Sequence, residues 1–360
     1  MSDTTQPCGL DDIDTPFLAI DLAVMDRNIE QLAGRLRGTG VQLRPHAKSH
    51  KCVEIAQRQI DSGAIGLTVA TIGEAEVFAD AGFTDLFIAY PLWLTPQKAD
   101  RIRKVTARAQ LRVGVDSIAG ARQLAEYLAD LPITVVIEVD SGHHRTGVDP
   151  AEAGDVAAAA RAAGLNVVGV FTFPGHGYTP GHRAEVAAQE SHALGAAAES
   201  LRAQGIEPSV ISGGSTPTVD AADNTVLTEV RPGVYPFNDA QQFELEVCTL
   251  DDIALSAVTT VVHTRDRTAV VDAGSKILGA DRPGWATGFG RVISEPDARI
   301  VALSEHHATI EFPGAAPDAG TRLRIAPNHL CNAVNLVDTL VVDTSGGPRR
   351  WAVAARGANT

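Results

Sequence analysis

The sequence predicts an α/β protein made of a (β/α)8 TIM-type barrel and a C-terminal all-β domain. Up to about residue 235, short apolar runs alternate with stretches of helical periodicity, the pattern of a parallel sheet covered by helices. After about residue 240 the helical pattern stops, and strand-like runs follow one another between Gly, Pro and Asp turns. A length of 360 residues is enough for both domains.

Eight apolar runs predict the strands of the barrel. They are rich in Val, Ile, Leu and Phe, which is typical of parallel strands buried on both faces. An open doubly wound sheet is the alternative, but eight strands without a Gly-rich nucleotide loop after the first favour the barrel. The runs are residues 41–45, 66–70, 85–90, 111–115, 133–139, 166–173, 208–211 and 226–230.

Helical signals fill most of the gaps between these runs. Apolar residues recur at helical spacing from Leu22 to Leu36, and residues 183–203 predict a long, Ala-rich amphipathic helix. A capping residue followed by Pro predicts helix starts at Thr95-Pro96 and Asp149-Pro150. Helix ends are predicted before Gly164 and Gly205.

The C-terminal part reads as a series of strands. One more apolar run, Phe17 to Ile20, precedes the first helix, and we expect it to cross over and pair with the β domain. The predicted barrel is therefore residues 22–240, and the β domain is residues 241–360 together with 14–21. The strand-like runs are 253–264, 268–272, 299–304, 321–326, 337–342 and 351–355.

Charge and composition exclude several classes of function. There are 30 basic and 44 acidic residues, a net charge of −14, which argues against a nucleic-acid surface. An anionic ligand must then be met by a local positive site. The polar, acidic start and the lack of a long apolar stretch predict neither a signal peptide nor a membrane span. Four widely spaced cysteines indicate reduced thiols or metal ligands in a cytoplasmic protein.

Polar, basic and Gly-rich segments follow five of the predicted barrel strands. In a barrel, the carboxyl ends of all strands meet at one face, where active sites lie. We therefore expect these segments to form one site at the mouth of the barrel. They are residues 44–51, 141–147, 174–178, 212–218 and 231–235.

The loop after the seventh strand predicts a phosphate-binding cup. Gly213 and Gly214 allow backbone N–H groups to approach an anion, and Ser212, Ser215 and Thr216 add hydroxyl donors. The loops after strands seven and eight often hold phosphate in such barrels. The alternative is that this Gly-Gly-Ser-Thr-Pro segment is an ordinary turn.

Lys48 is the candidate for a covalent cofactor linkage. It stands between two histidines, and an ammonium group near other cations and near burial has a depressed pKa, which suits a Schiff-base amine. The alternative is a solvated basic loop. Lys51 is the rival lysine, but we expect it inside the start of the second helix, where it would point less reliably into the mouth.

Three further residues of these loops are candidates for the site. Arg145 and Tyr178 could contact the ring of a bound cofactor, and ordinary loop hydrogen bonding is the alternative. His176 could shuttle protons, or it could be a structural histidine.

A separate pair, His329 and Cys331, predicts a metal site. On an extended strand, residues two apart face the same side, so both side chains could bind one ion. Imidazole with thiolate favours Zn²⁺, with other divalent ions such as Mn²⁺ or Mg²⁺ as alternatives. A half-buried cysteine beside a surface histidine is the non-functional alternative, since a structural site needs more ligands than two.

At these residues the chain resembles the D-threonine aldolase and D-serine dehydratase family, whose members have the alanine-racemase type of pyridoxal-phosphate (PLP) fold. The resemblance runs from Asp14 to about Asp338. It implies PLP bound as a Schiff base to Lys48 and a divalent metal on His329 and Cys331. The other matching segments are Arg145 as a cofactor-side arginine, residues 174–178 with the active-site Tyr178, and residues 212–216 with Gly233 and Tyr235 as phosphate-binding loops.

The resemblance also implies a reaction class. The expected substrate is a small D-amino acid with a 3-hydroxyl group, from which Lys48 would remove the α-proton. A cysteine as the second metal ligand is similar to the dehydratase branch, which forms a 2-oxo acid and ammonia, whereas aldolases of the family tend to have an aspartate there. Retro-aldol cleavage to glycine and an aldehyde, and a PLP carrier without turnover, are the alternatives. The fold implies a homodimer.

Overall fold

The computed structural model describes residues 9–360, and Cys8 lies outside them. The chain divides into two compact units, each described here by itself. We call residues 31–48, 55–233 and 357–360 the barrel unit. The described residues up to Glu30, with 49–54 and 234–356, form the β unit. Among residues 9–360, no helix is long and apolar enough to cross a membrane.

Eight parallel strands form the sheet of the barrel unit. They are β2 (Gln42–Leu43), β3 (Leu67–Val69), β4 (Asp85–Pro91), β5 (Gln110–Val115), β6 (Thr134–Glu138), β7 (Asn166–Phe171), β8 (Val210–Gly213) and β9 (Glu229–Val230). Their order is β2-β9-β8-β7-β6-β5-β4-β3. A parallel bridge between His46 and Thr68 joins the two edge strands, as does a 2.9 Å hydrogen bond from the Ile65 N–H to the Leu43 carbonyl. The predicted barrel is therefore confirmed, with strand ends shifted by up to three residues.

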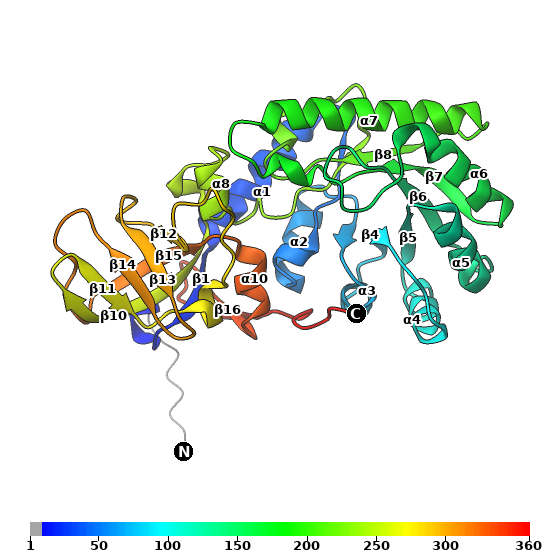
Figure 1. Cartoon of the computed structure of the whole chain (residues 1–360). Coiled ribbons are helices and arrows are strands. Elements are labelled where there is room, and N and C mark those ends of the chain that lie inside the picture. Colours follow the sequence, from blue (N-terminus) through cyan, green and yellow to red (C-terminus); the bar gives the residue numbers. More distant parts are fainter. Residues whose placement is uncertain (1–8) are drawn as a thin grey trace, which may run out of the picture. The chain divides into compact units, whose positions relative to one another are not determined.

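Helices lie around the outside of this sheet (Figure 1). Their bounds are α1 (Leu22–Leu36), α2 (Val53–Asp61), α3 (Ile72–Asp80), α4 (Pro96–Thr106), α5 (Ile118–Leu128), α6 (Ala153–Ala162) and α7 (Arg183–Ala203). Thr95 caps α4, since its hydroxyl accepts the Lys98 N–H at 3.3 Å. Helix α7 matches the predicted 183–203, and α6 ends two residues before Gly164.

The start of α2 differs from the expectation for Lys51. The helix begins at Val53, so Lys51 precedes it, with a left-handed φ of 52°. Its ammonium group donates a 2.8 Å hydrogen bond to Asn335 within the β unit. Because its ammonium group is already bonded, Lys51 is a weaker candidate than Lys48 for binding a cofactor. The sequence spacing could not predict this bond.

The β unit contains a nine-stranded mixed sheet. Its strands are β1 (Phe17–Asp21), β10 (Leu255–Arg265), β11 (Thr268–Val271), β12 (Gly290–Val292), β13 (Arg299–Leu303), β14 (Ala308–Glu311), β15 (Arg322–Pro327), β16 (Thr339–Asp343) and β17 (Arg349–Ala352). Strand β1 pairs antiparallel with β10 and parallel with β16. The prediction that the N-terminal run joins the β domain is therefore confirmed.

Five elements of this unit were not predicted. Strands β12 and β14 are only three and four residues long, at or below the shortest run from which a strand can be predicted. The unit is also not purely β, because it contains α8 (Ala240–Glu244), α9 (Ser275–Leu278) and α10 (Leu330–Asn335). None of these helices spans two turns, so no helical period could be read from the sequence.

Candidate active site

Lys48 and Arg145 meet on one aromatic ring at the carboxyl ends of the barrel strands. Lys48 lies in a short turn, Ala47–Ser49, soon after β2, and Arg145 lies in the loop after β6. The Lys48 ammonium and the Arg145 guanidinium each lie 5.2 Å from the centroid of the Phe173 ring. Phe173 follows β7 by two residues. Its role was missed from the sequence, although an aromatic residue at a strand end that opens on the mouth is the signal that could have found it.

Two histidines extend this group. The His143 ring packs edge-on against Phe173, with the centroids 5.6 Å apart. Burial and the positive charges of Arg145 and His176 hold the pKa of His143 below its usual range. His176 Nε2 lies 2.9 Å from the side-chain oxygen of Gln189. Its Nδ1 atom is buried and has no hydrogen-bond partner within residues 9–360.

The glycine-rich loop after β8 is folded against a buried carboxylate. The Gly214 N–H donates to Glu190 Oε1 at 2.5 Å, and the Ser215 N–H donates to the Thr218 hydroxyl at 3.0 Å. Gly214 has a φ of +77°, a conformation that favours glycine. At Gly213 an added Cβ would collide with the Glu190 carboxylate. Both glycines are thus required by the local packing.

Ser212 points into the barrel interior. Its hydroxyl donates to Glu229 Oε1 at 2.6 Å and accepts a bond from Arg231 at 2.5 Å. Arg231 also donates to the Thr172 carbonyl at 2.6 Å. These bonds occupy the Ser212 hydroxyl, and the Ser215 hydroxyl is likewise bonded to the Thr218 hydroxyl at 2.9 Å. The predicted contacts of Ser212, Ser215 and Thr216 with phosphate remain predictions.

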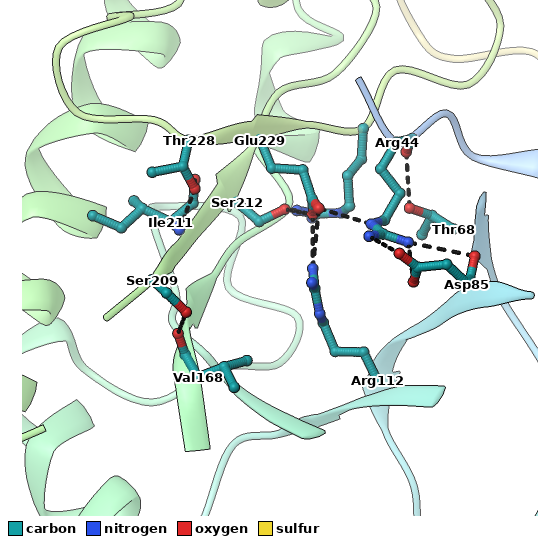
Figure 2. A network of polar contacts seen from close by, with 11 residues as sticks. Arg44, Thr68, Asp85, Arg112, Val168, Ser209, Ile211, Ser212, Thr228 and Glu229 are labelled. Carbon is teal, nitrogen blue, oxygen red and sulfur yellow. Dashed lines mark hydrogen bonds and ion pairs between the residues drawn. The ribbon is translucent and has the colours of Figure 1, made fainter. Parts of the chain in front are cut away.

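An ion network inside the barrel unit is centred on Glu229 (Figure 2). Glu229, the first residue of β9, pairs with Arg44 at 2.7 Å and with Arg112 at 3.0 Å. Arg44 also binds both oxygens of Asp85, at 2.7 and 2.9 Å. Burial opposes ionisation of Glu229, but the charges of Arg44 and Arg112 and the bond from Ser212 outweigh it and lower its pKa to about 2.

Two other buried carboxyl groups lack such partners. Glu138, at the end of β6, accepts a 2.9 Å bond from the Thr146 hydroxyl, but its Oε2 has no hydrogen-bond partner among the described residues. Glu190 is in the same situation, because only its Oε1 is bonded. Burial raises the pKa of each to about 7, against the hydrogen bonds that they accept. Both are therefore partly protonated near neutral pH.

This set of residues fits PLP. Lys48 is a half-buried amine that could bind the aldehyde, Arg145 supplies a nearby cation, and Thr216 lies in a buried hydroxyl-rich loop. The unpaired polar atoms of Glu138 and His176 are further contacts that a ligand could satisfy. Tyr178 is half-buried in the loop after β7, Gly233 ends the 55–233 segment, and Tyr235 is buried in the β unit.

His329 and Cys331 lie side by side in the β unit, but not on a strand. Strand β15 ends at Pro327, His329 is the residue before α10, and Cys331 is in the first turn of that helix, so the prediction that the pair lies on an extended strand is wrong. The two side chains nevertheless interact, because the charge of Cys331 raises the pKa of His329 well above its usual value, against the effect of burial. Asp239, fully buried, places its Oδ2 atom 3.6 Å from His329 Nδ1.

This pair fits a metal ion with open coordination positions. Within residues 9–360 no three His, Cys, Asp or Glu side chains are arranged to hold a metal ion together. A structural zinc site needs four protein ligands, whereas a catalytic metal keeps positions for water or substrate. A neighbouring imidazole and thiol are suitable donors for Zn²⁺.

Comparison with known proteins matches both parts of the chain. The alanine racemase N-terminal domain matches residues 20–240, and a putative serine dehydratase domain matches residues 254–342. D-threo-3-hydroxyaspartate dehydratase of Delftia sp. (strain HT23) is 37% identical, over 89% of this chain and 91% of its own. D-threonine aldolase of Arthrobacter sp. is 34% identical, over 96% of this chain and 93% of its own.

Solved structures agree with these matches. The structure of the Delftia dehydratase superposes with a TM-score of 0.87 and 34% identity, covering 94% of this chain and 97% of that one. A cysteine-to-alanine variant of the same enzyme, in the metal-free form, has a TM-score of 0.87, 33% identity and coverage of 94% and 97%. The prediction from the sequence motifs is confirmed: the chain belongs to the alanine-racemase-like family that includes D-threonine aldolase and D-serine dehydratase.

Proposed function

We propose that the protein is a PLP- and metal-dependent lyase that dehydrates D-amino acids with a 3-hydroxyl group to 2-oxo acids and ammonia. The observation that carries the proposal is the meeting of Lys48 and Arg145 on Phe173 at the carboxyl ends of the barrel strands. The family membership supports it, since the relatives include D-threo-3-hydroxyaspartate dehydratase and D-serine dehydratase.

Lys48 has two roles in this proposal. Its amine would hold the PLP aldehyde covalently and, when free, would take the proton from the substrate α-carbon. Bound PLP supplies an electron sink for the charge left on that carbon. Arg145 and Tyr178 orient the ring, while Thr216 and Ser215, with the backbone of residues 212–214 and 233–235, hold the phosphate.

His329 and Cys331 would hold the divalent metal, with Zn²⁺ favoured and Mn²⁺ or Mg²⁺ as alternatives. The ion supplies a Lewis acid for the 3-hydroxyl group of the substrate. The thiol of Cys331 favours the dehydratase branch over the aldolase branch. His176, held through Nε2 by Gln189, keeps its Nδ1 for proton exchange. Retro-aldol cleavage is the second candidate, supported by the 34% identity with D-threonine aldolase.

Product analysis tests this function. The metal-loaded protein would be incubated with D-serine, D-threonine and D-threo-3-hydroxyaspartate, and assayed for 2-oxo acids against glycine and aldehydes. We expect 2-oxo acids. Glycine with an aldehyde would establish the aldolase instead, and neither product, with PLP bound, would favour the carrier. Lys48→Ala should lose the borohydride-sensitive visible absorbance, whereas Lys51→Ala should keep it. Cys331→Ala should lose lyase activity and keep that absorbance.

We also propose a cytoplasmic homodimer. The three described cysteines, Cys52, Cys248 and Cys331, are free thiols, as expected in a reducing compartment. Analytical ultracentrifugation at micromolar concentration would test the dimer, and a single monomeric species would contradict it.

A further inference from the structure

We propose that Asp239 is a positioning residue for the metal site: its carboxylate holds the Nδ1–H of His329, so that Nε2 faces the ion together with the Cys331 thiolate. The inference rests on the metal site of the proposed function and adds to it a residue that no sequence motif indicated. Metal-binding histidines commonly donate their second ring N–H to a carboxylate, which sets the tautomer and the ring direction.

The Asp239 carboxylate is itself held in place by two backbone groups. It caps α8, because Oδ1 accepts the Gln242 N–H at 2.9 Å. Its Oδ2 atom accepts the Leu330 N–H at 3.3 Å. Leu330 stands between the two predicted ligands, so the same oxygen that faces His329 also holds the backbone between His329 and Cys331.

The His329 ring needs a partner at this position. Its Nδ1 atom is buried and has no hydrogen-bond partner among the described residues. Asp239 Oδ2, at 3.6 Å, is at ion-pair distance and slightly too far for a hydrogen bond. We infer that this contact shortens to a hydrogen bond when the ring binds a metal ion.

The charge of Asp239 leads to the same conclusion. Its side chain is fully buried, and among residues 9–360 His329 is its ion-pair partner, with no Arg or Lys in that role. A buried carboxylate without a cation is costly. A divalent ion bound to the His329 imidazole would place a positive charge next to this carboxylate.

Metal affinity tests the inference without relying on activity. Metal-stripped, PLP-loaded protein would be titrated with Zn²⁺ against a chromophoric chelator. Asp239→Asn removes the charge and leaves one oxygen, which can keep the Gln242 bond to the α8 cap but not also the Leu330 bond. We expect Zn²⁺ to bind about 10- to 100-fold more weakly. Asp252→Asn is the matched control, since Asp252 accepts the Thr249 N–H at 2.9 Å in the same unit. We expect its affinity to equal that of the wild type.

The outcomes separate the inference from the site itself. If His329→Ala weakens Zn²⁺ binding but Asp239→Asn does not, the role of Asp239 is overturned and the metal site stands. If the wild type binds no metal ion, both proposals fall. Should Asp239→Asn not fold, ¹⁵N NMR of histidine-labelled wild type with Zn²⁺ decides. A protonated Nδ1 and a metal-bound Nε2 on His329 support the inference, and the reverse assignment overturns it.

Discussion

Two regions inside the barrel unit bury carboxyl groups in opposite ways. In the first, Glu229 is surrounded by Arg44, Arg112 and the Ser212 hydroxyl, and its pKa is about 2 (Figure 2). In the second, Glu138 and Glu190 each keep one oxygen without a partner among residues 9–360, and their pKa values are about 7.

The number of partners of each carboxyl group distinguishes an acid that stabilises the fold from acids near the proposed ligand site. A buried charge that is paired and hydrogen-bonded stabilises a fixed arrangement, because removing one partner leaves the other as an unpaired charge inside the protein. Unpaired buried polar atoms are rare in native proteins and concentrate where a ligand or proton is handled. Among the described residues of the barrel unit, the unpaired carboxyl oxygens belong to Glu190, whose other oxygen holds the Gly214 N–H, and to Glu138, whose carboxyl group feels the charge of Arg145. Arg112 Nε is also unpaired, but the same guanidinium bonds Glu229 through its other nitrogen.

Removing the charge of Glu229 from its ion network should have the largest effect on the free energy of unfolding. Glu229→Gln keeps the shape of the side chain but leaves Arg44 and Arg112 with less negative charge in the barrel interior. We expect the free energy of unfolding to fall by about 3–5 kcal/mol, measured by urea denaturation at pH 7.

A half-buried surface pair provides the control. Glu76 pairs with Arg101 at 2.7 Å, with about a quarter of each side chain exposed to solvent. Glu76→Gln should cost about 1 kcal/mol or less, because solvent screens the pair. Equal losses of unfolding free energy in Glu229→Gln and Glu76→Gln would show that burial does not make the Glu229 network more important for stability.

The pH dependence of stability should show the two regions separately. The pKa of Glu138 and of Glu190 is raised from 4.5 to about 7 on folding, so the folded protein keeps protons that the unfolded chain loses in this window. Their contribution to the free energy of unfolding therefore falls as pH rises from 4.5 to 7, by at most about 3 kcal/mol each.

Glutamine variants can show which residue causes the fall in the free energy of unfolding between pH 4.5 and 7. Glu190→Gln and Glu138→Gln cannot ionise, so each should flatten the fall in stability between pH 4.5 and 7. Glu229 has the opposite sign, because its pKa is lowered on folding from 4.5 to about 2, and its contribution is lost as pH falls through that range. Urea titrations at half-unit pH steps would measure both. A wild-type slope retained in both glutamine variants would contradict the assignment.

A smaller loss is expected from Arg112→Met. The Arg112 guanidinium bonds both oxygens of Glu229 and packs 5.4 Å from the centroid of the Phe87 ring. Methionine can keep part of that packing, and Glu229 retains Arg44 and the Ser212 hydroxyl. We expect a loss of about 1–2 kcal/mol by urea denaturation. A loss as large as that of Glu229→Gln would indicate that Arg112, rather than Arg44, is the main partner of Glu229.

Much of the barrel and part of the site could be predicted from local patterns. Buried parallel strands are continuous apolar runs, and helix α4 begins at Pro96 after the Thr95 cap, as predicted. Lys48 could be predicted at the barrel mouth because it comes soon after a barrel strand, and the carboxyl ends of all barrel strands meet at that face. The turns at α10 could not be read, since six residues are too few for a helical period.

The sequence by itself determined the strand order of a closed barrel, the N-terminal strand of the β unit, the family and the residue types at the strand ends. These follow from periodicity and motifs, which involve neighbouring residues. Only the tertiary structure decided the pairings: Arg44 with Glu229 across 185 positions, Lys48 with Phe173, and Asp239 with His329. Such contacts depend on which side chains the fold brings within a few ångströms, and a carboxyl group there can be a structural ion or an unpaired acid, according to its neighbours.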